Sequence, residues 1–542
     1  MTRAAKIVVI PIFLLQLLLF VFIARHRFVD TDEGYYLLAS RLVLMHKKPY
    51  VDFFFQQAPL LPYVYALWLK LFHVTWSWAR LLPALLTALL GLLLYEDVCR
   101  QTRQWLAGLA STVLFATSTL VFAWMPIAKP YSLAGLFLFA AYTAVTRKMA
   151  KPSRWLLAAG GLSLALAVDT RSYLVLTAPL FLWWIARNFP ARLKSTGAFL
   201  VGFGIGLLPS LYLFLSSPAA FLFDNLGYHA IRTDAGLVGM WGQKVGVLLM
   251  LLLGSPEGNG IQNCLLLVIS LAFVFSISKS DWPPRLAFQL ALLLAAVSLL
   301  PTPVLPQYFS FCIPFLIVSA VCVVSHLISN IEIRRQLVAA SACLILTGIY
   351  VAFAIGDFRK YLITGNGIPT VRTLNDPDTW RLERIEQVSR AINQIARPGE
   401  TVASFWSGYL FQTHAAPLAG LETDCGILIA DKLSSQQRTH YHIVSWPELD
   451  ASFAASRPRV VVLENHQGLQ NMLVPDVLGN VAVNALLSRG YAVAQAFGDT
   501  AIYVCCSRSD ATKHPRPDQP TYSGTQRSDT AATAASAGLR NH

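Results

Sequence analysis

Long apolar segments alternate with short polar connections from the N-terminus to about residue 356. A helix that crosses a bilayer core needs about 20 apolar residues. We therefore expect about eleven membrane-spanning helices, two of them short, near residues 5–24, 78–98, 105–124, 127–146, 155–169, 172–187, 196–216, 261–278, 286–302, 309–329 and 336–356. The apolar run Val245–Leu253 is too short to cross and is expected to be re-entrant or interfacial. This pattern predicts a polytopic all-α membrane domain over residues 1–356.

A different pattern begins at about residue 357, where charged residues become more frequent. Apolar residues recur with a helical period over Arg381–Ala396, and Pro398 and Gly399 follow. We predict a small α/β domain over residues 357–508, with strands at Thr401–Phe405, Arg459–Leu463, Tyr491–Phe497 and Ala501–Cys505 and a helical stretch near Val481–Leu487. Residues 509–542 are rich in Ser, Thr, Ala, Asp and Pro without an apolar period, which predicts disorder.

The composition agrees with a membrane protein. Of the 542 residues, 55% are hydrophobic and 13% are charged, and the mean hydropathy is +0.52, which excludes an ordinary soluble protein. The net charge of +14 could indicate a nucleic-acid partner. The basic residues, however, lie in small groups between apolar runs rather than on one face, so we expect contact with membrane lipids and no nucleic acid.

The basic residues also predict the topology. Five alternate connections carry thirteen of them: Arg100, Arg103, Arg147, Lys148, Lys151, Arg154, Arg187, Arg192, Lys194, Lys279, Arg285, Arg334 and Arg335. The connections between these carry Lys129, Arg171, Arg232 and Lys244. By the positive-inside rule, the N-terminus is predicted to be cytoplasmic and the C-terminal domain to be extracytoplasmic. The first apolar segment has a basic start but no small-residue cleavage site, so we expect it to remain as an anchor.

The first outer loop, about residues 25–77, is expected to fold against the outer leaflet. It contains two runs rich in aromatic and apolar residues, Tyr50–Phe55 and Tyr63–Phe72, which look like interfacial helices.

An acidic motif, Asp30-Thr31-Asp32-Glu33-Gly34-Tyr35-Tyr36, opens this loop. Carboxylates so close to a membrane core are costly unless a partner or a reaction uses them. Asp32 and Glu33 are therefore the leading catalytic candidates. Alternatively, the pair caps a helix that begins near Gly34, and both roles can coexist.

The motif is followed by Arg41, Pro49-Tyr50, Asp52-Phe53-Phe54 and Gln57-Ala58-Pro59-Leu60. In this combination it resembles the GT-C superfamily of integral-membrane glycosyltransferases, in particular the bacterial branch related to protein O-mannosyltransferases and the lipid A aminoarabinose transferase. The resemblance covers about residues 5–330. It implies an inverting glycosyltransferase of the bacterial inner membrane, which moves a hexosyl or pentosyl group from a polyprenyl-phosphate carrier to a lipid, glycan or protein acceptor at the periplasmic face.

Inverting transfer explains why the motif is acidic. A single displacement at the anomeric carbon needs a base for the acceptor hydroxyl, whereas a departing phosphate needs far less protonation than a sugar alkoxide. The resemblance implies that Asp32 is this base and that Glu33 orients it or contacts the acceptor.

Two departures from the aminoarabinose branch change the expected donor contacts. Tyr35 stands where that branch carries Arg, and Gln56-Gln57-Ala58-Pro59-Leu60 stands where it carries Glu-Lys-Pro-Pro-Leu. The lost charges imply that other groups hold the phosphate and the sugar. Candidates for donor-phosphate or substrate binding are Tyr36, Gln57, Lys129, Arg171, His229, Arg232 and Tyr308. Snorkelling of Lys129, local pairing of Arg171 and a place for Tyr308 in an aromatic belt are equally valid explanations.

No metal site or cofactor is predicted, because the cysteines and histidines lack ligand spacing, although a divalent cation at the adjacent acids stays open. Gly202, Gly204 and Gly206 lie inside an apolar span and indicate close helix packing rather than a nucleotide loop. Two other functions stay open. A transporter or flippase of lipid-linked glycans would place ionisable residues deep in the spans, and a non-catalytic protein could assemble other envelope enzymes.

Overall fold

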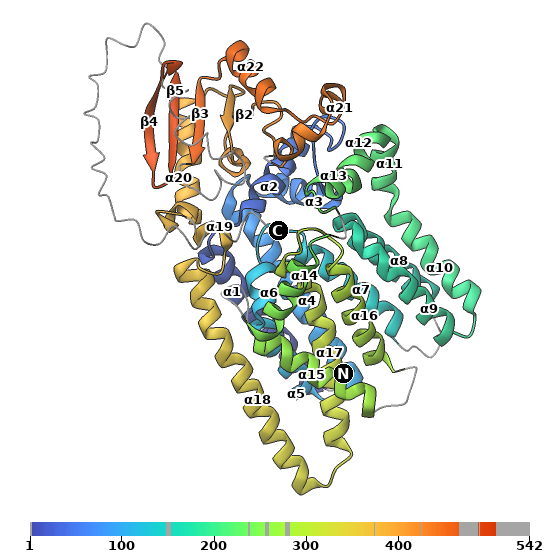
Figure 1. The fold of residues 1–542 in the computed structure, drawn as a ribbon. Coiled ribbons are helices and arrows are strands. Elements are labelled where there is room, and N and C mark those ends of the chain that lie inside the picture. The colour runs from blue at the N-terminus through green and yellow to red at the C-terminus, as the bar shows by residue number, and fades with distance from the viewer. Residues whose placement is uncertain are drawn as a thin grey trace.

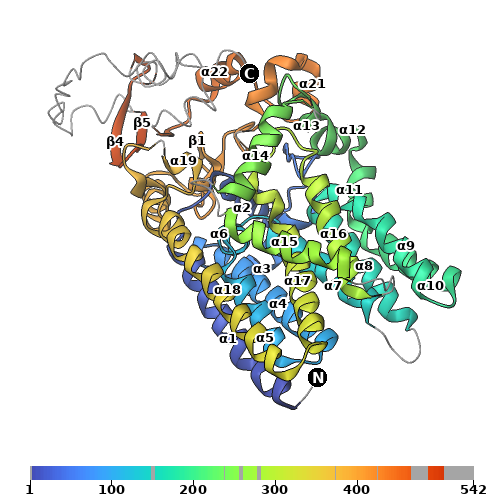
Figure 2. The same cartoon turned by 60° about the horizontal axis from the view of Figure 1, so that its bottom comes forward.

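The computed structural model describes residues 3–147, 153–236, 239–254, 260–276, 282–372, 374–423, 425–464, 486 and 488–505. Helices form most of the chain, and a small sheet lies at one end of them, on the same side as α2 (Thr31–Leu44), as Figures 1 and 2 show. The other helices up to residue 216 are α1 (Arg3–His26), α3 (Leu60–Leu71), α4 (Trp76–Thr102), α5 (Trp105–Thr117), α6 (Thr119–Trp124), α7 (Tyr131–Thr146), α8 (Arg154–Thr170), η1 (Ser172–Thr177), α9 (Ala178–Asn188), α10 (Arg192–Gly206) and α11 (Leu208–Ser216).

More helices follow after residue 216. They are α12 (Pro218–Leu222), η2 (Phe223–Gly227), α13 (Tyr228–Ile231), α14 (Trp241–Leu253), α15 (Gly260–Ser276), α16 (Pro283–Ser298), η3 (Pro306–Phe311), α17 (Cys312–Ser329), α18 (Ile333–Arg359), η4 (Lys360–Thr364), α19 (Pro369–Arg372) and η5 (Pro377–Trp380).

Among the described residues, four helices are long and apolar enough to cross a membrane: Val8–His26, Trp76–Thr102, Pro306–Ser329 and Arg334–Thr364. Helices α10 and α11 meet at 46° and make a fifth if the bent pair is one span. Several other expected spans are short or broken; segment 105–124, for example, is interrupted at Ser118. Eleven crossings are therefore not confirmed. Helix α14 has 13 residues, so its re-entrant or interfacial position stays a prediction.

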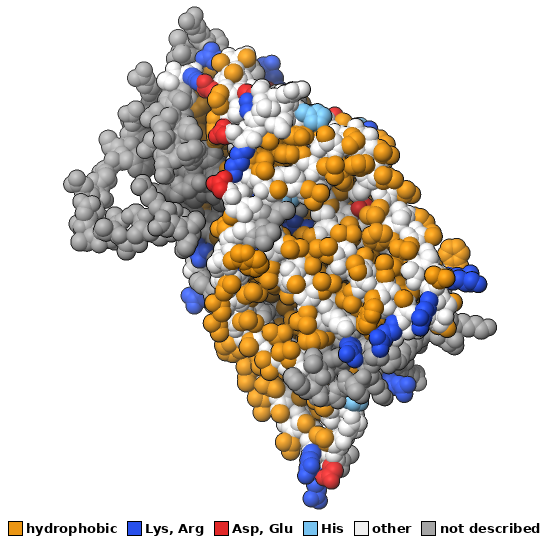
Figure 3. All heavy atoms as spheres, turned by 45° about the vertical axis from the view of Figure 1, so that its right-hand side comes forward, with side chains coloured by type: hydrophobic (Ala, Val, Ile, Leu, Met, Phe, Trp, Pro, Cys, Tyr) orange, Lys and Arg blue, Asp and Glu red, His pale blue; other side chains and the backbone are white. Residues whose placement is uncertain are grey.

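The surface of the helical part suits a lipid environment. Hydrophobic side chains cover the face seen in Figure 3, and Lys and Arg side chains gather toward its lower end. On α18, Leu344 and Ile355 are 74% and 67% exposed. Soluble monomers rarely expose apolar patches of this kind, so these helices are suited to a membrane.

Two glycines allow α8 and α10 to pack closely. A Cβ atom added at Gly202 would collide with the carbonyl oxygen of Ala158, and one added at Gly206 would collide with the side chain of Ala165. A Cβ atom at Gly204 would meet nothing. The predicted helix packing is thus confirmed at Gly202 and Gly206.

The outer loop differs from the prediction in one run. Helix α3 covers most of Tyr63–Phe72, as expected. The run Tyr50–Phe55 was predicted as an interfacial helix, which is wrong: it is a turn followed by extended chain, with Pro49 bridged to Phe53 and a φ of 68° at Tyr50. Its physical cause is local, because the Asp52 carboxylate accepts from the N–H of Lys48 at 2.6 Å and competes with helical hydrogen bonding.

The C-terminal sheet has five strands in the order β2-β1-β3-β5-β4. They are β1 (Thr401–Ser404), β2 (Ala416–Pro417), β3 (Val460–Glu464), β4 (Tyr491–Phe497) and β5 (Thr500–Cys505). Strand β1 runs parallel to β2 and β3, whereas β5 runs antiparallel to β3 and β4. All four predicted strands are confirmed, and the two-residue β2 was not predicted. The helix predicted near Val481–Leu487 lies, apart from residue 486, outside the described residues.

Alternating side chains give this sheet two packed faces. Val460 and Val462 face the main core, where they join the buried stripe of α20 (Leu382–Ile395). Val461 faces a second cluster that includes Leu449 and Phe453 of α22 (Trp446–Ser456). The remaining short helices of this part are η6 (Ser407–Leu410), η7 (Ile427–Lys432) and α21 (Ser435–His440).

Candidate active site

The acidic motif forms the first turn of α2. The helix begins at Thr31 rather than near Gly34, and Asp30 is its N-cap. The Asp30 carboxylate accepts from the N–H of Asp32 at 3.1 Å, and the Glu33 carboxylate accepts from the N–H of Asp30 at 2.9 Å, in a capping box. Asp30 and Glu33 therefore make the cap, which leaves the side chain of Asp32 free of it.

Glu33 is fully buried, and its carboxylate is saturated. Arg80 of α4 donates to it from Nε at 2.9 Å and from Nη2 at 2.5 Å, and the N–H of Ala128 donates at 3.0 Å. Arg80 also donates to the carbonyl oxygens at the end of α1, including that of Ala24. Of its two expected roles, this geometry favours orienting Asp32, because a carboxylate with 0% exposure offers no free oxygen to an acceptor.

Glu33→Gln is expected to lower the free energy of unfolding by about 3–5 kcal/mol, because Arg80 would remain as an uncompensated buried charge. Chemical denaturation of the purified protein, followed by tryptophan fluorescence, measures this change. Glu332→Gln is the matched control: its pair with Arg335 is mostly exposed, so its loss should have little effect. Equal stabilities of the two variants would contradict the role of the buried pair.

Asp32 and Asp30 share one cation, Lys129, which lies between α6 and α7. Lys129 Nζ lies 2.6 Å from Asp30 Oδ1 and 2.8 Å from Asp32 Oδ2. Burial acts to raise the pKa of Asp30, but the charges of Lys129 and Arg27 outweigh it and hold that pKa below its ordinary value. The Asp32 side chain is 39% exposed, whereas that of Lys129 is 1% exposed. Lys129 therefore does not snorkel to an interface, and Asp32 is the accessible member of the trio.

The two carboxylates do not suit a metal ion. Lys129 Nζ occupies the place between Asp30 and Asp32 that a divalent cation would need. Within the described part of the chain, no group of three or more His, Cys, Asp and Glu side chains is arranged to hold a metal. The residues present therefore do not fit the divalent cation that the sequence left open.

A second cluster surrounds Arg171, which directly follows α8. Its Nη2 donates to the hydroxyl of Tyr131 at 3.1 Å, and its Nη1 donates to Oε1 of Gln57. The ring centroids of Tyr131, Tyr173 and Tyr308 lie 5.4, 5.8 and 5.5 Å from its guanidinium carbon. Its Nε atom and the Tyr173 hydroxyl are buried without a hydrogen-bond partner among the described residues. A buried cation with a spare donor suits an anionic group such as phosphate.

Tyr36 is influenced by the charges of both clusters. It is buried, and its ring centroid is 4.2 Å from that of Tyr35. Burial raises the pKa of Tyr36 to about 12, although the positive charge of Arg171 opposes this rise and the negative charge of Asp32 reinforces it. Tyr36 stands one helical turn after Asp32 on α2, and its ring centroid lies 6.3 Å from that of Phe55, two residues before Gln57, the partner of Arg171. The structure therefore brings these predicted residues into one region.

His229 and Arg232 are committed to backbone groups. His229 Nε2 donates to the carbonyl oxygen of Gln56 at 3.0 Å, and burial, together with Arg232, lowers the pKa of His229 to about 3, so the ring is neutral at pH 7. Arg232 donates to the carbonyl oxygens of Thr302 at 2.6 Å and Pro303 at 3.3 Å. These contacts tie the segment after α13 to the chain before η3, and a phosphate contact by either residue stays a prediction.

The C-terminal domain is docked on α2. Trp406 Nε1 donates to the carbonyl oxygen of Thr31 at 2.9 Å. Arg41, at the other end of α2, donates to the carbonyl oxygens of Leu410 and Ala415, each at 2.6 Å. The domain therefore fixes the turn that carries the acidic motif.

Gly34→Ala is expected to disturb this docking. An added Cβ atom would lie 2.7 Å from the backbone nitrogen of Gly408 and 2.8 Å from the Trp406 ring. Overpacking of this kind costs about 1–3 kcal/mol, so the denaturation midpoint should fall. Gly204→Ala is the control, since no atom lies within 4 Å of its added Cβ. A Gly34→Ala variant as stable as the wild type would contradict this prediction, because it would show that the contact with Gly408 and Trp406 can accommodate the added methyl group.

Sequence reasoning placed Asp30 in the acidic motif but missed its role as the helix cap, and it missed Arg80 and Trp406 as parts of this region. The spacing of Asp30 and Glu33 is that of a capping box and could have revealed the cap. Arg80 is a charge within the predicted span 78–98, which is itself a signal of function or pairing. Trp406 had no local signal, because its contact with Thr31 joins residues 375 positions apart.

Comparisons with known proteins identify the fold. Residues 56–213 match the family model described as dolichyl-phosphate-mannose-protein mannosyltransferase. No curated protein sequence matches the chain. The crystal structure of ArnT from Cupriavidus metallidurans bound to undecaprenyl phosphate superposes with a TM-score of 0.64 at 12% identity, over 92% of this chain and 98% of that one. The arabinofuranosyltransferase AftD from Mycobacteria gives 0.50 at 14% identity, over 94% of this chain and 40% of that one.

At such low sequence identity, the superpositions establish the fold, and the ArnT match extends over nearly the whole of both chains. The chain thus has the GT-C fold that its acidic loop motif indicated, and over residues 56–213 it is similar to the dolichyl-phosphate-mannose-protein mannosyltransferases.

Proposed function

We propose that this chain is an inverting glycosyltransferase that moves a monosaccharide from a polyprenyl-phosphate carrier to a lipid, glycan or protein acceptor at the periplasmic face of a bacterial inner membrane. The carrier class is supported by the matching family model and by the undecaprenyl phosphate bound to ArnT. One observation carries the proposal. A partly exposed carboxylate, Asp32, shares a region with Arg171, whose Nε is buried and lacks a partner among the described residues.

Asp32 acts as the base in this reaction. It takes the proton of the acceptor hydroxyl while the hydroxyl oxygen attacks the anomeric carbon from the face opposite the phosphate. The new glycosidic bond forms as the bond between that carbon and the phosphate oxygen breaks, so the configuration inverts. The electron pair leaves on the phosphate, which needs no protonation by a second carboxylic acid.

Arg171 stabilises the departing phosphate. One N–H of each Nη atom donates to Gln57 or Tyr131, and the buried Nε, which has no partner among the described residues, is a donor for a phosphate oxygen. The hydroxyl of Tyr173, also without a partner among the described residues, is a second donor nearby. Donors fixed in a water-poor site need no reorganisation as charge develops, which makes this stabilisation effective.

Lys129 orients Asp32 through a contact of 2.8 Å. The same ammonium also pairs with Asp30, at the shorter distance of 2.6 Å. Lys129, Asp30 and the buried Glu33 are therefore positioning residues, and Asp32 is the catalytic residue.

The test is transfer by the purified full-length protein in nanodiscs, with a panel of labelled polyprenyl-phosphate sugars and with membrane lipids, glycans and proteins as acceptors. We expect transfer that depends on Asp32 and releases the polyprenyl phosphate. Movement of the lipid-linked sugar across a vesicle bilayer without transfer would indicate a flippase instead. If the assay detects neither transfer nor movement, the envelope-assembly role is favoured.

Transfer is also expected to persist in excess EDTA. Lys129 Nζ supplies the positive charge between Asp30 and Asp32, so the proposed chemistry needs no divalent ion at that place. Rates measured before and after exhaustive chelation check this. A loss of activity that Mg²⁺ or Mn²⁺ restores would contradict it.

A further inference from the structure

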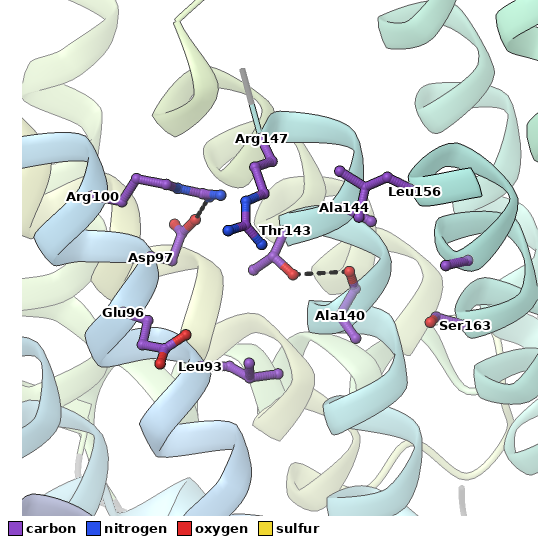
Figure 4. Close-up of a pocket in the computed structure, with 11 residues that line it drawn as sticks. Leu93, Glu96, Asp97, Arg100, Ala140, Thr143, Ala144, Arg147, Leu156 and Ser163 are labelled. Carbon is purple, nitrogen blue, oxygen red and sulfur yellow. Dashed lines mark hydrogen bonds and ion pairs between the residues drawn. The ribbon is translucent and has the colours of Figure 1, made fainter. Parts of the chain in front are cut away.

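A cavity of about 500 Å³ lies at the remote end of the helical part and has no role in the chemistry above. It opens between the last turns of α4 and α7 and the first turns of α8 (Figure 4). The start of α4 lies against the C-terminal domain, where the N–H of Trp76 donates to Gln412 at 3.2 Å. At about 1.5 Å per residue, Asp97 lies about 30 Å along the helix from Trp76. A bilayer core is also about 30 Å thick, so the cavity lies at the level of lipid headgroups on the membrane face opposite Asp32.

The cavity has a charged wall and an apolar wall. Glu96, Asp97 and Arg100 of α4 and Arg147, just after α7, form the charged wall. Leucine and alanine side chains from α4, α7 and α8 form the apolar wall. This combination suits an amphiphile rather than a soluble anion.

Two of the four charges are already matched. Asp97 is buried, and its two carboxylate oxygens accept from Arg100 and Gln101. Glu96 and Arg147 are exposed and have no ion-pair or hydrogen-bond partner among the described residues. In Figure 4 the guanidinium of Arg147 is directed into the pocket, beside Asp97 and Thr143. The cavity therefore offers one unmatched positive and one unmatched negative group.

We propose that this cavity binds the headgroup of a membrane phospholipid that carries both a phosphate and a protonated amine, as phosphatidylethanolamine does. Arg147 binds the phosphate through charge-assisted hydrogen bonds, together with the N–H groups of Arg100 that do not donate to Asp97. Glu96 accepts from the ammonium, and the acyl chains leave along the apolar wall. A headgroup with phosphate but no amine would place its negative charge near an unmatched Glu96, and free phosphate would leave the apolar wall uncovered.

Native mass spectrometry of the purified full-length protein tests this site without reference to catalysis. The probes are phosphatidylethanolamine, phosphatidylglycerol and inorganic phosphate. We expect retention of phosphatidylethanolamine over the other two. Glu96→Gln and Arg147→Gln should each weaken this retention about tenfold, the effect of one charge-assisted hydrogen bond.

Arg103→Gln is the matched control, because Arg103 is an exposed arginine at the same end of α4 that does not line the cavity. It should retain the lipid like the wild type. Unchanged retention in Glu96→Gln and Arg147→Gln would overturn the proposal. So would an equal loss in Arg103→Gln, equal retention of phosphatidylglycerol, or binding of inorganic phosphate in place of lipid.

Discussion

Asp32→Asn is expected to reduce the rate of sugar transfer at least about 10²-fold while the protein still folds. Asparagine keeps the shape of the side chain and its contact with Lys129, but it cannot take the proton of the acceptor hydroxyl. The helix cap does not depend on this side chain, because Asp30 and Glu33 make the capping box. Initial rates with the labelled donor measure the loss, and the denaturation midpoint should stay near that of the wild type.

Asp52→Asn is the matched control for this experiment. Asp52 is an exposed carboxylate in the same loop, and its contact with the N–H of Lys48 can be kept by an asparagine oxygen. We expect a rate close to that of the wild type. A fully active Asp32→Asn variant, or an equal loss in both variants, would refute the assignment of Asp32 as the base.

Features that depend on near neighbours in the chain could be predicted from the sequence. The stripe of α20 repeats within one or two helical turns, and the strands β3 and β4 differ from their predicted bounds by at most one residue. The acidic motif is equally local, and its place at the start of a helix follows from it. In each case, the side chains that decide the structure lie within a few residues of one another.

Partners from distant elements could not be predicted in this way. Glu33 is paired with Arg80, 47 residues away, and this pair exists because α4 packs along α1, from where Arg80 reaches the first turn of α2. The location of the Tyr50–Phe55 run, as distinct from its local turn, also depends on distant elements, because such a run suits either a lipid interface or a protein core. Phe53 and Phe55 are buried in the core because neighbouring helices cover the loop. Hydropathy measures the free energy of moving a side chain out of water, but it does not distinguish a lipid environment from a protein core.

Apolar composition also indicated where the hydrophobic segments lie, but it did not indicate where their helices bend or break. The span expected at 196–216 bends by 46° between α10 and α11, where Pro209 stands in the first turn of the second helix. The span expected at 105–124 is divided at Ser118. Such breaks at membrane depth are tolerated where neighbouring helices or a cavity satisfy the backbone. The short helices beside the candidate active site, α6 and η1, follow breaks of this kind.

Arg171→Lys is expected to lower kcat/KM for the lipid-linked donor about 10²-fold, although the charge is conserved. The guanidinium of Arg171 donates to Gln57 and Tyr131 and still has Nε left for a phosphate. A lysine ammonium is a point charge that cannot present three donors in one plane, and it loses the stacking on the tyrosine rings.

Arg187→Lys is the matched control: Arg187 lies 5.6 Å from the ring of Trp183 on α9, outside the cluster, and should tolerate the change. Steady-state kinetics with varied donor measure both variants. If Arg171→Lys keeps the wild-type kcat/KM, or if both arginine variants fall alike, the tyrosine-framed cluster does not hold the donor phosphate.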